Sequence, residues 1–229
     1  VKDNPKSPIS EAYRTLRSNI QFSSFDKEMQ MMLITSSGPG EGKSTTCCNL
    51  ALALAETGNS VLLMDCDLRK PSIHKKFKIS NYTGLSNVIA GQTKFENAGH
   101  WYNKSLCILT SGKIPPNPTE MLASKRMKAF LKESREVFKY IVLDAPPVIA
   151  VTDPQILSTM VDGVVMVVSS GVAEIEAAQR AKELLEHVNA NIIGTVLNRV
   201  DVARKKGYYG SYYYCYGDDR KKVKKHKEE

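Results

Sequence analysis

The sequence predicts an α/β fold in which a mostly parallel sheet is covered by helices on both faces. Two observations support this prediction: short runs of consecutive apolar residues recur along the chain, and helical patterns separate several of them. Strands that are apolar throughout are typical of a parallel sheet that is buried on both sides. The predicted strands span 31–35, 61–65, 106–110, 140–144, 163–169 and 192–197, and the main predicted helices span 8–22, 45–56, 124–138 and 173–187.

The first predicted helix, 8–22, has a clear start signal. Ser7 is a capping residue, and Pro8 suits the first helical position. Apolar residues then share one face, namely Ile9, Tyr13, Leu16 and Ile20. We therefore expect an amphipathic helix of about four turns.

Length and composition divide the chain into one domain and a tail. The 229 residues, 42% of them apolar, are enough for a buried core, which we place in 1–200. Residues 201–229 show no packing period and contain nine Lys/Arg against five Asp/Glu, a net +4 that is half of the chain's +8. We therefore predict that 201–229 is a flexible, basic extension.

Composition also excludes several classes of protein. No run approaches the roughly 18 apolar residues of a membrane-spanning helix, and the first residues lack the apolar segment of a signal peptide. The five cysteines and four histidines show no metal-ligand spacing, so we expect reduced thiols and no zinc site. These features predict a soluble cytoplasmic protein.

A glycine-rich loop separates the first buried strand from the second predicted helix. Its sequence, Ser-Gly-Pro-Gly-Glu-Gly-Lys-Ser over 37–44, nearly matches the phosphate-binding pattern G-x-x-x-x-G-K-[ST], with Ser37 in place of the first glycine. Lys43 is expected to reach the β- and γ-phosphates, Ser44 to ligate Mg²⁺, and the helix N-terminus to face the anion. A glycine-rich turn without a ligand is the alternative. The predicted nucleotide-binding residues here are Gly38, Gly40, Glu41, Gly42, Lys43, Ser44 and Thr45.

Acidic residues follow two other predicted strands. Asp65 and Asp67 stand at the end of the second strand, where alternation along an extended chain would point both to the same side. One carboxylate could hold hydrated Mg²⁺ while the other accepts a proton from an attacking hydroxyl, although loop-starting or helix-capping aspartates are also common. Asp144 ends the fourth strand, as expected for an acid that supports Mg²⁺. Together with the loop, these acids predict phosphoryl-transfer chemistry.

Two further sets of polar residues have weaker signals. Asn198 follows the last strand, where its amide could read an adenine edge or simply belong to a polar loop. Glu11, Arg14 and Arg17 lie at intervals of three residues on the first helix. Such a set is usually a solvated face with an i,i+3 ion pair, and a contact between subunits is the sharper interpretation.

Six of the ten tyrosines crowd into 208–216: Tyr208, Tyr209, Tyr212, Tyr213, Tyr214 and Tyr216. Interspersed Gly and Ser and the flanking charges make this run a poor core, so we expect it to be accessible. A nucleotide site together with clustered hydroxyl acceptors suggests a kinase that modifies its own tail. An aromatic patch that binds a partner or stacks on nucleic-acid bases is the alternative.

These motifs together closely resemble those of the bacterial tyrosine kinases (BY-kinases) that regulate capsule and exopolysaccharide synthesis. The resemblance runs from about Ser10 to Tyr216 and includes Gly-x-Ile-Pro-Pro-Asn-Pro at 112–118. It implies a P-loop NTPase fold, ATP with Mg²⁺, and autophosphorylation of the tyrosine cluster between subunits of a ring. By position, Lys43 binds phosphate, Ser44, Asp67 and Asp144 serve the metal, and Asp65 is the candidate base. Glu11, Arg14 and Arg17 fall on the ring-forming motif.

The resemblance also implies a partner and a cellular place. Related kinases of Gram-positive type work with a separate membrane protein whose cytoplasmic end activates them, which would recruit this chain to the inner face of the membrane. The runner-up function is a switch ATPase of the partitioning or septum-positioning type. Gly38 stands where those ATPases carry a signature lysine, which disfavours that alternative. Nothing before the tail calls for a nucleic-acid partner, and none is expected.

Overall fold

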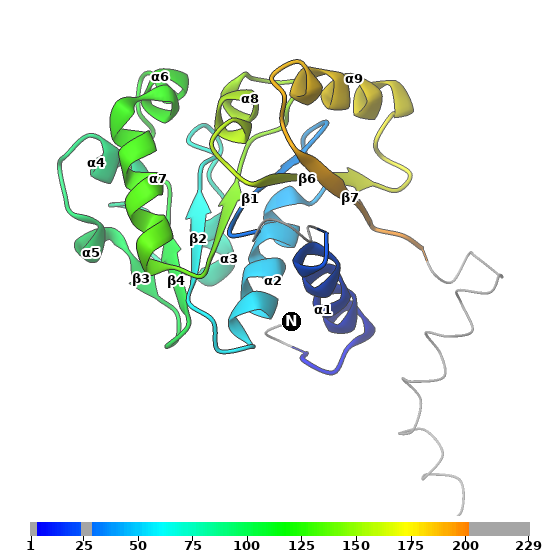
Figure 1. The fold of residues 1–229 in the computed structure, drawn as a ribbon, viewed down its shortest axis with the longest axis horizontal. Coiled ribbons are helices and arrows are strands. Elements are labelled where there is room, and N and C mark those ends of the chain that lie inside the picture. Colours follow the sequence, from blue (N-terminus) through cyan, green and yellow to red (C-terminus); the bar gives the residue numbers. More distant parts are fainter. Residues whose placement is uncertain (1–3, 24–28, 202–229) are drawn as a thin grey trace, which may run out of the picture.

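A seven-stranded sheet in the order β3-β4-β2-β5-β1-β6-β7 forms the centre of the computed structural model, which describes residues 4–23 and 29–201 (Figure 1). Every pair of neighbouring strands is parallel except β3 with β4. The mostly parallel sheet predicted from the apolar runs is therefore confirmed. The strands are β1 (Met31–Ser36), β2 (Val61–Asp65), β3 (His100–Trp101), β4 (Leu106–Leu109), β5 (Tyr140–Asp144), β6 (Gly163–Ser169) and β7 (Ile192–Asn198).

Helices cover both faces of this sheet. One face is packed by α1 (Pro8–Gln21), α2 (Lys43–Ala55) and α3 (Ile73–Phe77). The other is packed by α4 (Leu85–Ile89), α5 (Phe95–Ala98), α6 (Pro118–Ala123), α7 (Lys125–Val137), α8 (Asp153–Ser158) and α9 (Ile175–Glu186). The three-layer arrangement explains why the strands are apolar on both sides.

Alternation along the central strand β1 shows how one segment serves two cores. Met31 and Leu33 belong to the core beneath α4–α9, whereas Met32 and Ile34 belong to the core beneath α1–α3. All four side chains are fully buried. Each strand residue thus contributes to one core or the other, and β1 is held by packing on both faces as well as by strands on both sides.

The start of α1 follows its sequence signal. Ser7 Oγ accepts a hydrogen bond from the backbone N–H of Ser10 at 3.2 Å, and Pro8 occupies the first helical position. Ile20 is buried against the core of the α1–α3 face, and the Arg17 guanidinium donates to the carbonyl of Ala53 in α2 at 2.7 Å. Helix α1 therefore lies on α2, the helix that follows the glycine loop.

Several short elements were not predicted. Antiparallel β3 and the helices α3, α4, α5, α6 and α8 each have six residues or fewer, too few for a hydrophobic period to emerge. Boundaries also shift: the helix predicted for 45–56 begins at Lys43, and the strand predicted for 106–110 ends at Leu109. The predicted extension 201–229 lies outside the described residues apart from Asp201.

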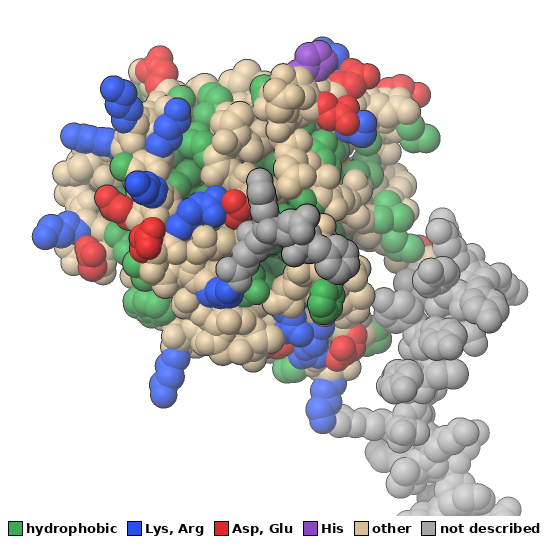
Figure 2. All heavy atoms as spheres, in the orientation of Figure 1, with side chains coloured by type: hydrophobic (Ala, Val, Ile, Leu, Met, Phe, Trp, Pro, Cys, Tyr) green, Lys and Arg blue, Asp and Glu red, His purple; other side chains and the backbone are tan. Residues whose placement is uncertain are grey.

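Charge is distributed unevenly over the face of the molecule shown in Figure 2. In Figure 2, basic side chains gather over the region of α6 and α7, and acidic ones over α9. The basic residues of α7 are Lys125, Arg126, Lys128, Lys132 and Arg135. Among the described residues, no helix is both long and apolar enough to cross a membrane.

Candidate nucleotide-binding and catalytic site

Three strand ends and one glycine loop form the candidate site. Asp65 of β2 pairs in register with Asp144 of β5, and Asp144 pairs with Ile34 of β1. The loop 37–42 leaves the end of β1 and leads directly into α2. Because these strands are parallel, the predicted acids and the predicted phosphate-binding loop meet at one edge of the sheet, where ligands of open α/β folds bind.

The glycine loop has the backbone conformation that its sequence suggested. Gly40 and Gly42 have φ angles of 77° and 97°, in the left-handed region that side chains other than glycine rarely adopt. A Cβ atom on Gly42 would also lie 2.0 Å from the Asn198 amide nitrogen. Gly42 immediately precedes α2, whose first residue is Lys43. The loop thus brings backbone close to the helix N-terminus, as a phosphate cradle requires.

The buried carboxylate of Glu41 holds this loop in place through hydrogen bonds. Glu41 is 2% exposed, and its Oε1 accepts hydrogen bonds from the Ser37 hydroxyl and the backbone N–H of Gly38, both at 2.5 Å. Its Oε2 accepts from the backbone N–H of Ser169, at the end of β6, at 3.2 Å. Ser37, which replaces the first glycine of the pattern, therefore has a partner of its own within the loop. Glu41 holds the loop to the sheet through these bonds.

Lys43 lies between two acids. Its Nζ is 2.9 Å from Asp67 Oδ2, 3.5 Å from Asp144 Oδ1 and 3.2 Å from the Ser44 hydroxyl. Burial disfavours the charged ammonium, but the charges of Asp144 and Asp67 outweigh that cost and raise the pKa of Lys43. The lysine is therefore held in its charged form, and its single positive charge is shared between the two carboxylates.

Asp144 has unused capacity to bind a cation. It is fully buried, and its Oδ2 has no hydrogen-bond partner among the described residues. Burial raises its pKa, an effect that the nearby Lys43 charge only partly offsets. A buried carboxylate oxygen without a partner is costly unless a ligand uses it. Together with Asp67 and the Ser44 hydroxyl it could supply hard oxygen donors of the kind that Mg²⁺ prefers.

Asp65 and Asp67 have different hydrogen-bond partners. The sequence predicted that alternation along an extended chain would point both side chains to the same side. Strand β2 ends at Asp65, so strand alternation does not extend to Asp67. Asp65 Oδ2 accepts from the backbone N–H groups of Ser72 and Ile73, both at 3.0 Å, and its Oδ1 accepts from that of Asp67 at 3.2 Å. Burial and the charge of Asp144 raise the pKa of Asp65 to about 7. Asp67 instead faces Lys43.

The remaining predicted residues contact their own chain. The Asn198 amide donates to the backbone carbonyl of Glu41 at 2.9 Å, so it supports the glycine loop in this structure. Arg14 pairs with Glu11 on the same helix and with Glu56 just beyond α2. Arg17 reaches the carbonyl of Ala53, while its Nε is buried without a partner among the described residues. The six clustered tyrosines lie outside the described residues.

The sequence pattern did not reveal a polar cluster beside the site. Arg69, two residues after Asp67, forms a bidentate ion pair with Asp153 at 2.9 and 3.2 Å, and Thr119 bonds to both. Asp153 begins α8 and is fully buried. In the sequence, Asp153 stands before a proline and resembles an ordinary helix start. The signal that could have indicated the cluster was Arg69, which follows the paired acids.

Comparisons with known proteins agree with this geometry. A family model described as the ParA family, NUBPL iron-transfer P-loop NTPase, matches residues 28–228. Tyrosine-protein kinase YwqD of Bacillus subtilis is 46% identical over 210 residues, covering 90% of this chain and 89% of that protein. Tyrosine-protein kinase CpsD of Streptococcus agalactiae is 36% identical, covering 88% of this chain and 89% of that protein. The chain is a BY-kinase.

Solved structures give the same family. The chimeric protein CapA2B2 is 39% identical with a TM-score of 0.85, covering 87% of this BY-kinase and 88% of that chain. The kinase domain of Escherichia coli tyrosine kinase ETK is 30% identical with a TM-score of 0.82, covering 90% and 83%. The cell division ATPase MinD of Pyrococcus furiosus, at 21% identity and a TM-score of 0.63, shares the P-loop fold.

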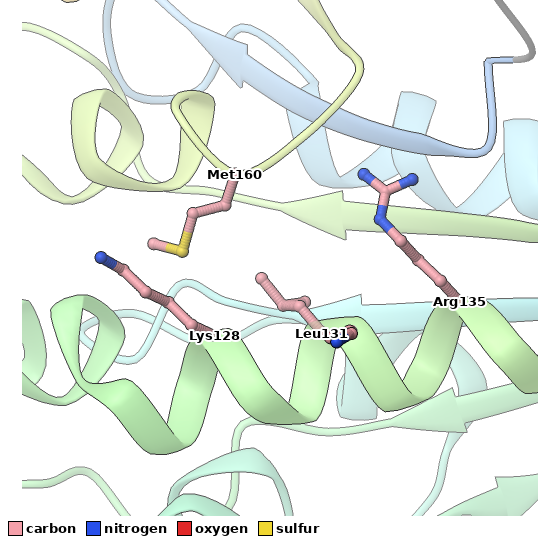
Figure 3. Close-up of a pocket in the computed structure, with 5 residues that line it drawn as sticks. Lys128, Leu131, Arg135 and Met160 are labelled. Carbon is pink, nitrogen blue, oxygen red and sulfur yellow. The ribbon is translucent and has the colours of Figure 1, made fainter.

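A small cavity of about 180 Å³ lies away from the Lys43 site of this BY-kinase (Figure 3). It is lined by Lys128, Leu131, Lys132 and Arg135 of α7 and by Met160, which follows α8. Arg135 also pairs with Asp162, whose Oδ2 accepts from the backbone N–H of Met31 at the start of β1. The cavity is therefore near the amino ends of the strands, whereas the predicted catalytic residues lie at their carboxyl ends.

Proposed function

We propose that this BY-kinase transfers the γ-phosphoryl group of ATP to the C-terminal tyrosine cluster of a neighbouring copy. Membership of the family makes the chain a protein-tyrosine kinase with a P-loop nucleotide site. The observation that carries the finer proposal is the placement of Lys43 between Asp67 and Asp144 at the mouth of the glycine loop. Phosphoryl transfer depends mainly on positioning and charge neutralisation, and this arrangement supplies both.

ATP and Mg²⁺ fit the residues present. The backbone N–H groups of the glycine loop would receive the phosphates, and the oxygens of Ser44, Asp67 and Asp144 would hold the metal ion. In this structure the Lys43 ammonium pairs with the two acids that would hold Mg²⁺, and it would be available to the phosphates once those acids held the metal ion. Mg²⁺ would supply charge stabilisation for the transferring group.

Asp65 is the proposed general base. Its pKa of about 7 suits a group that must accept a proton near neutral pH. Asp65 is fully buried, and its Oδ2 is bonded to the backbone of Ser72 and Ile73, so a tyrosine hydroxyl reaches the carboxylate only if a neighbouring segment moves. We therefore propose that entry of the acceptor tyrosine is accompanied by movement of the segment 72–73.

Transfer between copies is tested by separating donor from acceptor. The donor is an active chain that lacks 208–216, and the acceptor is full-length protein carrying Lys43→Met. With MgATP and the activating partner present, we expect phosphotyrosine on the acceptor alone, detected by intact mass. The control acceptor also carries phenylalanine at Tyr208, Tyr209, Tyr212, Tyr213, Tyr214 and Tyr216, and it should stay unlabelled.

Two outcomes of this mixing experiment would contradict the proposal. Labelling only when one chain has both an intact site and an intact tail would exclude transfer between copies. Steady phosphate release without any phosphotyrosine, unchanged by the deletion of 208–216, would favour the switch ATPase, in which water replaces tyrosine as the nucleophile. The structural likeness to MinD concerns the fold and does not favour that alternative.

We propose that Glu11, Arg14 and Arg17 support a ring of subunits. On α1, Glu11 is exposed and Arg14 is partly exposed, whereas Arg17 donates to a backbone carbonyl of α2. Replacing Arg14 with alanine should therefore weaken self-association and leave the unfolding temperature almost unchanged, because exposed ion pairs add little stability. Arg17→Ala should affect both. Sedimentation velocity and thermal unfolding of the two variants measure these effects, and unchanged association for both would exclude the helix from the interface.

We further propose a membrane-anchored activator of the polysaccharide co-polymerase type and a role in capsule or exopolysaccharide synthesis. Membership of the BY-kinases supports this proposal. The activator would bring the chain to the inner face of the cell membrane. Activity measured with and without the cytoplasmic segment of such a partner tests it, and full activity of the isolated chain would argue against a required activator.

A further inference from the structure

The cluster of Arg69, Thr119 and Asp153 joins three segments of the chain, one of which is the turn that carries Asp67. Arg69 follows β2, Thr119 is in α6 immediately after the segment 112–118, and Asp153 begins α8 after β5. The Arg69 guanidinium contacts both Asp153 oxygens, and the Thr119 hydroxyl donates to Asp153 Oδ1 at 2.6 Å and accepts from Arg69 at 2.8 Å. Asp153 is fully buried, whereas the Arg69 side chain is 38% exposed, and the two N–H···O bonds between them set the orientation of the guanidinium.

The same cluster fixes one end of the turn that carries Asp67. Asp67 Oδ1 accepts from the backbone N–H of Lys70 at 2.9 Å, closing a turn that contains Arg69. At the other end, the backbone N–H of Cys66 donates to the carbonyl of Asp144 at 2.9 Å. Leu68, between the two, is fully buried. The carboxylate that faces Lys43 is thus attached to a turn that is anchored on both sides.

We propose that Arg69, Thr119 and Asp153 are positioning residues that hold the Asp67 carboxylate in place for the metal ion. The inference rests on the proposed metal role of Asp67. Outer residues that orient metal ligands commonly contribute 10- to 100-fold to metal affinity, because a ligand that is free to rotate must be ordered when the metal binds. The cluster also makes the position of Asp67 depend on α6 and α8, which begin 51 and 86 residues later in the chain.

The test compares two arginine–aspartate pairs in the same protein. Asp153→Asn breaks the proposed positioning pair, and Asp162→Asn breaks the bidentate Arg135–Asp162 pair, whose distances are 2.9 and 2.8 Å, at the opposite edge of the sheet. For Asp153→Asn we expect the half-saturating Mg²⁺ concentration for binding a fluorescent ATP analogue to rise about 10-fold. For Asp162→Asn it should change by less than about 2-fold, at a temperature where both variants are folded.

Hydrogen exchange of the nucleotide-free protein gives a second readout. Peptides covering 66–72 should exchange faster in Asp153→Asn than in wild type, since the turn in which the Lys70 amide donates to Asp67 loses one of its anchors. Asp162→Asn should leave these peptides unchanged. If Asp153→Asn does not fold, Arg69→Lys carries the same test, because it keeps the charge but loses the bidentate geometry.

Three results bear on the inference. Unchanged Mg²⁺ dependence in both Asp153→Asn and Arg69→Lys would overturn it, as would equal effects of Asp153→Asn and Asp162→Asn. A wild-type protein that binds MgATP without labelling tyrosine even with the activating partner present would contradict the proposed function and leave this test intact, because neither readout depends on tyrosine transfer.

Discussion

Replacing Lys43 with methionine is expected to lower tyrosine labelling by at least 100- to 1,000-fold. The ammonium is the cation that the structure places at the glycine loop, 2.9 Å from Asp67 and 3.5 Å from Asp144. Removing one preorganised group that stabilises developing charge typically reduces the rate by about this factor. The measurement is phosphotyrosine formation over time with MgATP and the activating partner present.

Lys43→Met also changes the charge balance of the buried site, so folding must be measured alongside activity. Asp67 and Asp144 lose their shared cation, and removing one partner of a buried ion pair costs about 3–5 kcal/mol when the other stays charged. Lys104→Met is the matched control, because it removes an exposed lysine from the turn between β3 and β4. Undiminished labelling by folded Lys43→Met would exclude the proposed site.

The architecture was predictable because most of the strands, β1, β2, β4, β5 and β6 among them, are largely continuous apolar runs. The same signal does not give the order of the strands. β5 lies between β2 and β1, although β2 follows β1 in the chain with one helix between them. The strand order depends on the way in which the long segments between strands pack across the sheet, and no local sequence pattern predicts it. The two-residue β3 has no period at all.

The candidate site was predictable for a topological reason. Lys43, Asp65 and Asp144 each stand at or after the carboxyl end of a parallel strand, and such ends meet at one edge. The finer contacts were not predictable, because they join residues far apart in sequence. Glu41 contacts Ser169, 128 positions later, and Arg69 contacts Asp153, 84 positions later.

Local geometry also limited what the acidic motif revealed. Alternation predicts a common direction for Asp65 and Asp67 only if both are in extended strand, and the strand ends between them. The chain turns there because the Asp67 carboxylate accepts from the Lys70 N–H and the Asp65 carboxylate from Ser72 and Ile73. Aspartates commonly form such turns with their own backbone. The two acids therefore serve different parts of the site.

Asp65→Asn is expected to reduce phosphoryl transfer by about 100- to 10,000-fold while the protein stays folded. An asparagine oxygen in the Oδ2 position can still accept from Ser72 and Ile73, so only the longer bond from the Asp67 N–H is lost. The substitution also removes a buried carboxylate whose pKa is raised to about 7 by burial and by the charge of Asp144. We expect these effects to offset each other to within about 1 kcal/mol of unfolding free energy.

Asp65→Ala is the informative contrast, because it leaves the N–H groups of Ser72 and Ile73 without an acceptor. Each unsatisfied buried donor costs about 1–3 kcal/mol, so this variant should lose stability as well as activity. Urea unfolding measures the loss of stability. Single-turnover transfer to the tail, at saturating MgATP, measures the loss of activity. Asp67→Asn removes a proposed metal ligand, so it should instead raise the Mg²⁺ concentration that transfer needs. Transfer within about 3-fold of wild type in folded Asp65→Asn would show that another group, or the tyrosine hydroxyl unaided, manages the proton.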